Sequence, residues 1–193
     1  ENLYEFQRFL LESGQPSYFT IPRLKKIMKQ VLEALHFIHG LNLIHCDVKP
    51  ENIVIKSYSR CEVKLIDFGS SCYTHDHATS YIQSRSYRAP EVILGLAYNQ
   101  KIDIWSLGAV LSELFTGYVL FQNESIQTML ARIGGIVGTS AAPRLCGFAG
   151  FEEQVELTLP RFLCRRPFPG AHAACRHGVP PLLHDEWCGV RGA

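Results

Sequence analysis

The sequence predicts a mainly helical α+β fold, and three patterns support this prediction. Residues 20–40 carry apolar side chains at spacings of three and four, which indicates an amphipathic helix. Residues 101–116 are apolar on nearly every helical face, which indicates a buried helix. Between them, a short apolar run at 53–55 and an alternating run at 62–66 flank a polar turn, so a β-hairpin is expected there.

The first residues are expected to belong to the folded chain. Residues 1–7 read ENLYEFQ, which is similar to a protease-cleavage tag with one residue inserted. The apolar positions Leu3, Phe6 and Leu10, however, continue as one face of a helix, and we therefore interpret the segment as native.

The boundaries of the helix at 20–40 follow from its end residues. Thr20 is a suitable N-cap, Pro22 falls in the first turn and Gly40 is suited to end the helix. A further helix is expected from Ser125, as its cap, to Ile133.

Four polar residues flank the predicted hairpin. Asp47, Lys49 and Asn52 precede its first strand, and Asp67 follows its second. Because a hairpin brings its two ends together, we expect these residues to share one small site. An ordinary hairpin with solvated turn residues is the alternative.

These residue types suit phosphoryl transfer. Asp67 and Asn52 offer the oxygen ligands that Mg²⁺ accepts. Lys49 supplies a mobile positive charge for a transferring phosphate, and Asp47 can take the proton of an attacking hydroxyl.

The motifs at these positions resemble the C-terminal lobe of a eukaryotic protein kinase. His45-Cys46-Asp47 stands where most kinases have His-Arg-Asp. This triplet, the segment DFGSSC at 67–72 and the run YIQSRSYRAPE at 81–91 are similar to the dual-specificity tyrosine-regulated (DYRK) kinases. The resemblance extends from Asn2 to about Ile133 and implies a C-lobe fold, ATP and Mg²⁺ as ligands, and transfer to Ser or Thr of protein substrates.

The resemblance also assigns the polar segment 69–91 as an activation loop. It implies autophosphorylation of Tyr81, whose phosphate could bind Arg85 and Arg88 because Cys46 replaces the usual arginine. Arg88 should also shape a pocket that favours proline after the phosphoacceptor. An unmodified Tyr81 is the alternative.

Other residues are expected to support this site. Val54 is expected on the floor of the ATP pocket, together with Lys49 as a nucleotide contact. His45, Glu91, Asp103 and Trp105 match structural positions of the family, and the resemblance implies that they support the site rather than react. Glu91 is expected to lack its usual arginine partner.

Cys46 and Cys72 each lie near a predicted site aspartate, and the hairpin should bring them together. A redox-sensitive pair and inert packing cysteines are the two interpretations.

Composition excludes several classes of function. The formal net charge of +1 implies no nucleic-acid partner, and no apolar run reaches the length of a membrane span. Seven cysteines without zinc-type spacing, and no signal-peptide pattern, favour an intracellular protein of the cytoplasm or nucleus that is not secreted.

The chain is expected to divide into a partial kinase domain, 1–139, and an irregular tail, 140–193. The tail is rich in Ala, Gly, Pro and Arg and lacks Lys, Ile, Asn, Tyr and Met, which suggests a changed reading frame or mispredicted exon. Its Cys164, Cys175, His177 and Cys188 fit no zinc template.

Two functions of different classes remain open. The first is a DYRK-like kinase. The second is a non-catalytic C-lobe fragment that docks a substrate or regulatory partner, or the product of a faulty gene model. The second function is considered because this sequence contains no Gly-rich loop, strand lysine or helix glutamate of a kinase N-terminal lobe. We therefore expect the N-terminal lobe to be absent from this sequence.

Overall fold

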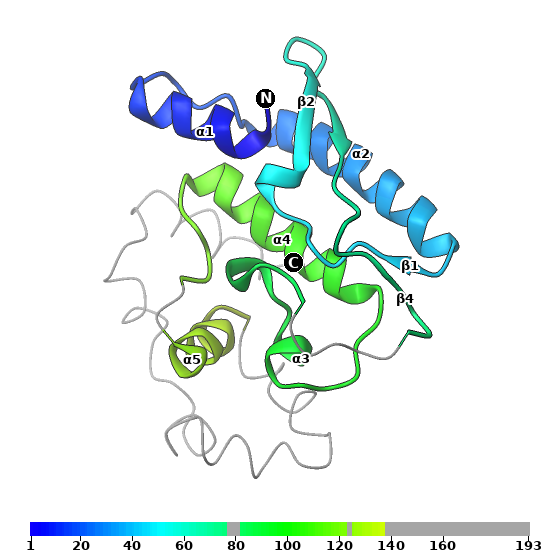
Figure 1. The fold of residues 1–193 in the computed structure, drawn as a ribbon. Helices are drawn as coiled ribbons and strands as arrows, with labels where there is room; N and C mark the ends of the chain where they lie inside the picture. The colour runs from blue at the N-terminus through cyan, green and yellow to red at the C-terminus, as the bar shows by residue number, and fades with distance from the viewer. Residues whose placement is uncertain (77–81, 123–124, 138–193) are drawn as a thin grey trace, which may run out of the picture. The chain divides into compact units, whose positions relative to one another are not determined.

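The two long helices expected from the sequence are present in the computed structural model as α2, Ile21–Gly40, and α4, Lys101–Thr116 (Figure 1). The structure describes residues 1–76, 82–122 and 125–137. The chain divides into two compact units, Glu1–Met129 and Leu130–Ala193, and the second is described only at residues 130–137. The boundary predicted at residue 139 lies outside the described residues and stays a prediction.

The remaining elements are short. In chain order they are α1 Leu3–Glu12, β1 Leu43–Ile44, η1 Pro50–Asn52, β2 Ile53–Ser57, β3 Glu62–Leu65, β4 Cys72–Tyr73, η2 Arg85–Tyr87, α3 Pro90–Ile93 and α5 Ile126–Val137. The described residues are thus mainly helical, with two antiparallel two-stranded sheets, as the predicted fold class requires.

The predicted hairpin is formed by β2 and β3, with Ile53 opposite Leu65 and Ile55 opposite Val63. The second sheet pairs β1 with β4, so Ile44 lies opposite Cys72. Figure 1 shows this pair beside the end of α2. The second sheet was not predicted, because strands of two residues carry no periodic signal.

The first residues of the chain are part of the fold. Asn2 caps α1 through a capping box with Glu5, and it forms a β-bridge with Val54. Leu3 is fully buried. The expected helix in this segment is therefore confirmed, and its interpretation as native stays a prediction.

The ends of α2 differ in detail from the expectation. Thr20 is the N-cap residue, but its side chain makes no capping hydrogen bond. Gly40 is the last helical residue, and the left-handed residue that follows the helix is Asn42, with φ of 58°. Asparagine tolerates this conformation because its short polar side chain can bond locally. Ser125 caps α5 as predicted, since its hydroxyl accepts the Thr128 N–H at 3.1 Å.

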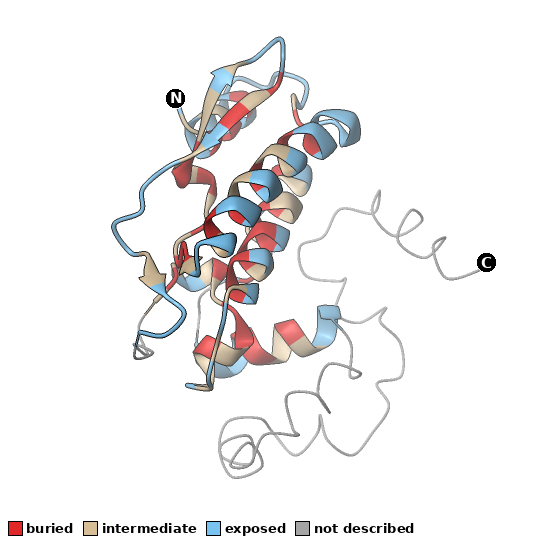
Figure 2. Cartoon of the chain, turned by 90° about the vertical axis from the view of Figure 1, so that its right-hand side faces the viewer, coloured by how far each residue is buried: buried red, intermediate tan, exposed pale blue. Residues whose placement is uncertain are grey.

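The core lies where α2 and α4 pack together and against the strands. Val31 and Leu35 of α2 and Ile102 and Val110 of α4 are almost fully buried. Figure 2 shows buried positions along the long helices and exposed positions at the tip of the hairpin. No helix in the described ranges has both the length and the apolar character needed to cross a membrane.

Candidate functional site

The loop between β1 and β2 carries Asp47, and a buried carboxylate from α4 fixes its backbone. Asp103 accepts the His45 N–H at 2.9 Å and the Cys46 N–H at 3.0 Å. It is fully buried, and His39 of α2 contacts it through Nε2 at 2.8 Å. These bonds hold Cys46 at a φ of 65°, a left-handed conformation that non-glycine residues adopt only when the surroundings impose it.

His45 connects this loop to the end of the hairpin. The Asp47 N–H donates to His45 Nδ1 at 3.3 Å, so the ring proton is on Nε2, which donates to the Ile66 carbonyl at 3.0 Å. The Phe68 ring packs 5.0 Å from the His45 ring, centroid to centroid. A buried histidine thus links the segments that carry Asp47 and Asp67.

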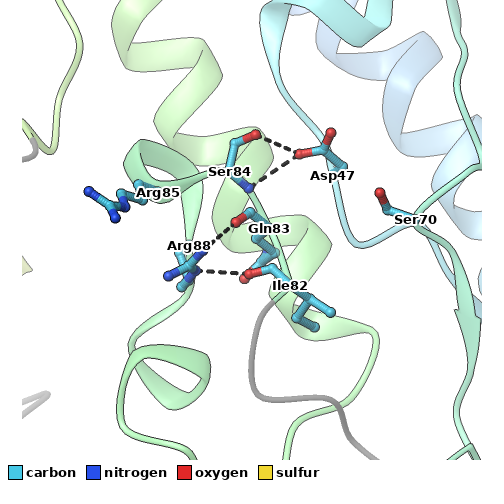
Figure 3. A pocket seen from close by; sticks show the side chains of 7 residues that line it. All are labelled: Asp47, Ser70, Ile82, Gln83, Ser84, Arg85 and Arg88. Carbon is cyan, nitrogen blue, oxygen red and sulfur yellow. Dashed lines mark hydrogen bonds between the residues drawn. The ribbon is translucent and has the colours of Figure 1, made fainter.

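Asp47 is the centre of a dense polar network (Figure 3). Lys49 Nζ donates to Asp47 Oδ2 at 2.7 Å, and Asn52 Nδ2 donates to the Asp47 carbonyl at 2.8 Å and to Oδ2 at 3.2 Å. On the other side, the Ser84 hydroxyl and N–H both donate to Asp47 Oδ1, at 2.8 and 3.2 Å. Three residues expected at one site are therefore brought together, and Ser84 joins them.

These contacts favour the ionised form of Asp47. Burial by itself raises the pKa of the carboxyl group, but the hydrogen bonds and charge of Lys49 and the bonds from Ser84 outweigh it. The net result is a pKa below the ordinary value for an aspartate. Asp47 is therefore a carboxylate at neutral pH and is able to accept a proton.

Asp67 reaches the same region by its backbone but not by its carboxylate. The Ile66 N–H donates to the Asn52 carbonyl at 2.9 Å, so the hairpin brings the two segments together as expected. The Asp67 carboxylate is exposed and accepts the Gly69 N–H of its own turn at 3.1 Å. Among the described residues it makes no hydrogen bond or ion pair with Asp47, Lys49 or Asn52.

The donor set nevertheless fits a hard cation such as Mg²⁺. Both amide hydrogens of Asn52 face Asp47, which leaves the amide oxygen of Asn52 for a metal. The exposed Asp67 carboxylate is the second oxygen donor. No cluster of three His, Cys, Asp or Glu side chains suited to a metal occurs in the described part of the chain. A cation held by these two residues would therefore need phosphate or water oxygens as further ligands.

A cavity of about 450 Å³ opens beside Asp47 (Figure 3). Its lining is mostly from the segment that enters η2: Asp47, Ser70, Ile82, Gln83, Ser84, Arg85 and Arg88. Such a cavity next to a carboxylate that already accepts a hydroxyl hydrogen could admit a further hydroxyl group.

The two arginines of this cavity differ in their contacts. Arg88 donates from Nε to the Ile82 carbonyl and from an Nη to the Gln83 carbonyl, both at 2.8 Å. Arg85 is exposed, and its guanidinium makes no hydrogen bond or ion pair with any described residue. Tyr81, the predicted phosphorylation site, lies outside the described residues.

Gln83 was not singled out from the sequence, although the structure makes it central to this segment. It is buried and has a φ of 62°. Its side-chain amide donates to the Ile102 carbonyl at 3.0 Å and to the Ser106 hydroxyl at 2.8 Å, and it accepts the Ala89 N–H at 2.9 Å. Its place within the run at 81–91 was the only sequence signal for it.

Two carboxylates, Glu51 of η1 and Glu113 of α4, form an acidic cluster near Tyr87 of η2. The Tyr87 hydroxyl donates to Glu113 Oε2 at 2.7 Å, and burial raises the pKa of the Glu113 carboxyl, with a further increase from the charge of Glu51. Within the described residues, Oε2 of Glu51 is buried and has no hydrogen-bond partner. A buried carboxylate oxygen without a donor is costly, and a cation would satisfy it.

The residues expected to support the site have mixed environments. Trp105 stacks on Phe121 with ring centroids 5.5 Å apart, and its Nε1 is buried without a partner among the described residues. Glu91 is half-buried in α3, and its carboxylate has no ion pair within the described ranges. Val54 is half-buried in β2 opposite Lys64.

Comparison with known proteins points to one family. Residues 4–145 match the protein kinase domain. The chain is 44% identical over 137 residues to dual specificity tyrosine-phosphorylation-regulated kinase 2 of Drosophila melanogaster. This match covers 71% of this chain and 18% of the relative. It is 45% identical over 141 residues to dual specificity tyrosine-phosphorylation-regulated kinase 4 of Homo sapiens, and this match covers 73% of this chain and 26% of the relative.

A similar match is found in fission yeast. The DYRK-family kinase pom1 of Schizosaccharomyces pombe is 44% identical over 138 residues, covering 72% of this chain and 12% of the relative. The chain therefore spans about a quarter or less of the length of these three relatives.

Proposed function

Because the chain belongs to the DYRK family of protein kinases, we propose that it forms the catalytic-loop part of a kinase that transfers the γ-phosphate of ATP to Ser or Thr hydroxyls. One observation carries this proposal: a serine hydroxyl, that of Ser84, already donates to Asp47 Oδ1 at 2.8 Å. A substrate hydroxyl that enters the adjoining cavity would meet the same carboxylate.

The proposed mechanism follows from the charges at this point. Asp47, ionised because its bonding partners lower its pKa, orients the attacking hydroxyl and takes its proton. Lys49, 2.7 Å from Asp47, places a positive charge where negative charge develops on the transferred phosphoryl group. Neither residue needs to move far, since both are held by the Ser84 and Asn52 contacts.

Magnesium and ATP belong to the proposal as well. Asn52 and Asp67 would hold Mg²⁺, which when bound neutralises phosphate charge and orients the phosphate chain. Val54, at the start of the hairpin, would contact the nucleotide, with Lys49 near its phosphates. What supports this arrangement is the free amide oxygen of Asn52 and the exposed carboxylate of Asp67.

A preference for proline after the phosphoacceptor is supported by the backbone at Gln83. The left-handed φ of 62° and the bond from Arg88 direct the Gln83 carbonyl to the arginine. We propose that this orientation turns the carbonyl away from a bound peptide, so that a peptide N–H at this position would be left without an acceptor. Proline has no N–H to leave unsatisfied, so it loses nothing at this position.

A preference for basic substrates is supported by the acidic cluster of Glu51 and Glu113. The unpartnered carboxylate oxygen of Glu51, with Glu113 close enough for the two charges to interact, would gain a hydrogen-bond donor from an arginine or lysine of the substrate.

We further propose that Tyr81 is autophosphorylated and pairs with Arg85. The support is that Arg85 is exposed and makes no ion pair or hydrogen bond with the described residues.

Magnesium-ATP turnover on a basic Ser-Pro peptide tests the proposal. The purified chain is compared with Asp47→Asn, and with Asp76→Asn as a control at an exposed turn aspartate. Loss of the base should lower kcat by about 10²–10⁴-fold, while the control stays close to the unaltered chain. No turnover in any of the three, with far-UV circular dichroism that shows folded protein, would contradict catalysis by this chain and support the non-catalytic docking function.

A further inference from the structure

A local excess of positive charge lies on α2 and the hairpin. Residues 23–33 and 56–64 contain seven lysines and arginines but only two glutamates, in a chain whose formal net charge is +1. All seven basic side chains are exposed. Because α2 packs against β3, the two segments contribute their charges to one region of the surface.

One carboxylate, that of Glu62 in β3, lies among three of these cations. Arg60 donates to it from Nε at 2.8 Å and from an Nη at 3.2 Å, and Lys56 Nζ lies 3.9 Å from it. The hydrogen bond from Arg60 is the main reason that the pKa of Glu62 is lowered, and the charges of Arg60, Lys56 and Lys26 lower it further. A single glutamate cannot neutralise three cations, so positive charge remains for an acidic partner.

A groove of about 230 Å³ lies between α2 and β3, next to this charge. Most of its lining is aliphatic: Val31 and Ala34 come from α2, and Val63 and Leu65 come from β3. Gln30 and Lys64 complete the lining. The groove is large enough to admit the side chain of one leucine. An apolar floor with a positive rim is therefore open to a ligand that carries both an aliphatic group and negative charge.

The outer edge of β3 adds free backbone groups to this groove. Gln30 already uses part of the edge, since its Oε1 accepts the Val63 N–H at 3.1 Å and its Nε2 donates to the Cys61 carbonyl at 2.7 Å. Bonds alternate along an antiparallel strand, and Ile66 bonds on the β2 side, so the N–H and C=O of Leu65 point to the outer edge. Neither group of Leu65 makes a hydrogen bond within the described ranges. An extended peptide can supply the missing partners.

We propose that this face docks an extended acidic segment of a partner protein, anchored by a leucine or a similar aliphatic residue. The aliphatic side chain fills the groove, and the backbone of the segment bonds to Leu65. Successive side chains of an extended chain point to opposite sides, so the residues that flank the anchor meet the positive rim at Lys26 and Lys64. Acidic residues are favoured at those flanking positions because they complement the rim.

The apolar floor favours a peptide over a nucleic acid. Phosphate groups would use the cations but would leave the aliphatic lining of the groove exposed to water. The groove shares no lining residue with the cavity beside Asp47, and peptide binding requires no phosphoryl transfer. The proposal therefore stands or fails separately from the proposed function.

Fluorescence anisotropy with the full chain tests the site. The probe is a fluorescein-labelled peptide of sequence Glu-Leu-Asp-Leu-Glu. Two matched peptides replace either both leucines by serine or all three acidic residues by lysine. We expect the acidic leucine peptide to bind at least about tenfold more tightly than either control, because only it provides both the apolar anchor and the negative charge.

Variants of the chain locate the binding. Lys26→Glu and Lys64→Glu should each weaken binding of the acidic leucine peptide by about fivefold or more at low ionic strength, and by less at high ionic strength. Lys101→Glu reverses an exposed charge at the start of α4 and is the matched control, with binding expected to stay within about twofold. Ala34→Trp should fill the groove and remove the advantage of leucine over serine. Should it fail to fold, the exposed lysine variants still decide.

The proposal is overturned if none of the peptides binds, or if the serine peptide binds as tightly as the leucine peptide, since the attraction would then be electrostatic alone. Equal weakening by Lys26→Glu and Lys101→Glu would also overturn it. So would tighter binding of a single-stranded oligothymidine that displaces the peptide, because the face would then suit a nucleic acid. Self-association of the chain that Lys26→Glu and Lys64→Glu abolish would instead assign the face to a second copy.

Discussion

The carboxylate of Asp103 accepts the backbone N–H of Cys46 at 3.0 Å, across 57 residues of sequence. The same carboxylate accepts the His45 N–H, so one buried side chain fixes two consecutive peptide groups immediately before Asp47. The left-handed backbone of Cys46 is the result. The orientation of the proposed base is therefore decided in α4, not in the loop that carries it.

Replacement of Asp103 by asparagine should destabilise this arrangement strongly. The amide has one acceptor oxygen in place of two, and its NH₂ group would face a backbone N–H. We expect the free energy of unfolding to fall by about 3 kcal/mol, as for a buried charged group whose partners are lost. Urea unfolding followed by circular dichroism measures this change.

The matched control is Asp76→Asn, which alters an exposed aspartate that accepts the Tyr73 N–H. Its effect should stay within about 1 kcal/mol. Equal effects of the two substitutions would show that Asp103 has no special role in holding the loop.

The Ser84 hydroxyl should tune the acidity of Asp47. In Ser84→Ala, Asp47 loses a hydrogen bond that lowers its pKa, so the acidic limb of the pH–rate profile should move to higher pH. Ser84→Thr keeps the donor and should leave the limb in place. We expect turnover of the alanine variant to fall most, relative to the unaltered chain, at the acidic end of the profile and least at neutral pH.

The sign of the accompanying stability change follows from linkage. Because the folded-state pKa of Asp47 is depressed, its contribution to stability is present above the unfolded pKa and lost as pH falls through the folded pKa. In Ser84→Ala the folded-state pKa is less depressed, so this contribution to stability should be smaller and its loss should be complete at a higher pH. A pH–rate profile that is identical in the alanine and threonine variants would contradict the assigned role of this hydroxyl.

Arg88 should control the preference for proline. Arg88→Lys replaces a fork that holds two carbonyls by a single ammonium group, which releases the Gln83 carbonyl for a peptide N–H. We expect the ratio of kcat/KM for Ser-Pro over Ser-Ala peptides to fall by about tenfold. Arg60→Lys, an exposed change at the hairpin, is the control and should preserve the ratio. A ratio unchanged in both variants would separate Arg88 from proline selection.

Glu113 should make stability decline as pH rises. Burial raises its folded-state pKa, so the unfolded chain releases the proton at lower pH than the native state does. Native stability is then highest below the unfolded pKa and falls as pH rises through the folded pKa. Glu113→Gln keeps an acceptor for the Tyr87 hydroxyl and removes the titrating group. The gain in stability relative to the unaltered chain should therefore be larger at about pH 8 than at about pH 4.

Chemical unfolding at these two pH values measures the difference. Glu33→Gln is the control, because Glu33 lies exposed on α2 and is only loosely paired with Lys29 at 3.8 Å. Its effect should be small and nearly independent of pH. An effect of Glu113→Gln that does not change with pH would contradict the raised pKa.

Local patterns were sufficient to predict the elements that carry the site. The spacing of Val31 and Leu35 indicated α2, and the alternation around Val63 indicated β3, because backbone geometry fixes how side chains repeat along a helix or strand. The group Asp47, Lys49 and Asn52 was also predictable, since its members are close in sequence.

The contacts of these residues were not predictable in the same way. Sequence favoured Lys49 as a mobile charge, whereas in the structure it is bonded to Asp47. Sequence expected Arg88 to bind a phosphate on Tyr81 and to shape the proline pocket; in the structure its guanidinium donates to two backbone carbonyls, and the phosphate contact stays a prediction. A side chain with several donors binds whichever acceptors packing brings near, and the sequence does not state which these are.

By itself, the sequence determined which residues are candidates for the proposed chemistry and which segments become the long helices and the hairpin strands, because both depend on neighbours along the chain. Only the tertiary structure decided that Asp103 fixes the loop, that the Ser84 hydroxyl donates to Asp47 and that the sulfur of Cys46 contacts that of Cys72. The physical reason is that hydrogen bonds act over about 3 Å, so their partners are set by how distant segments pack together.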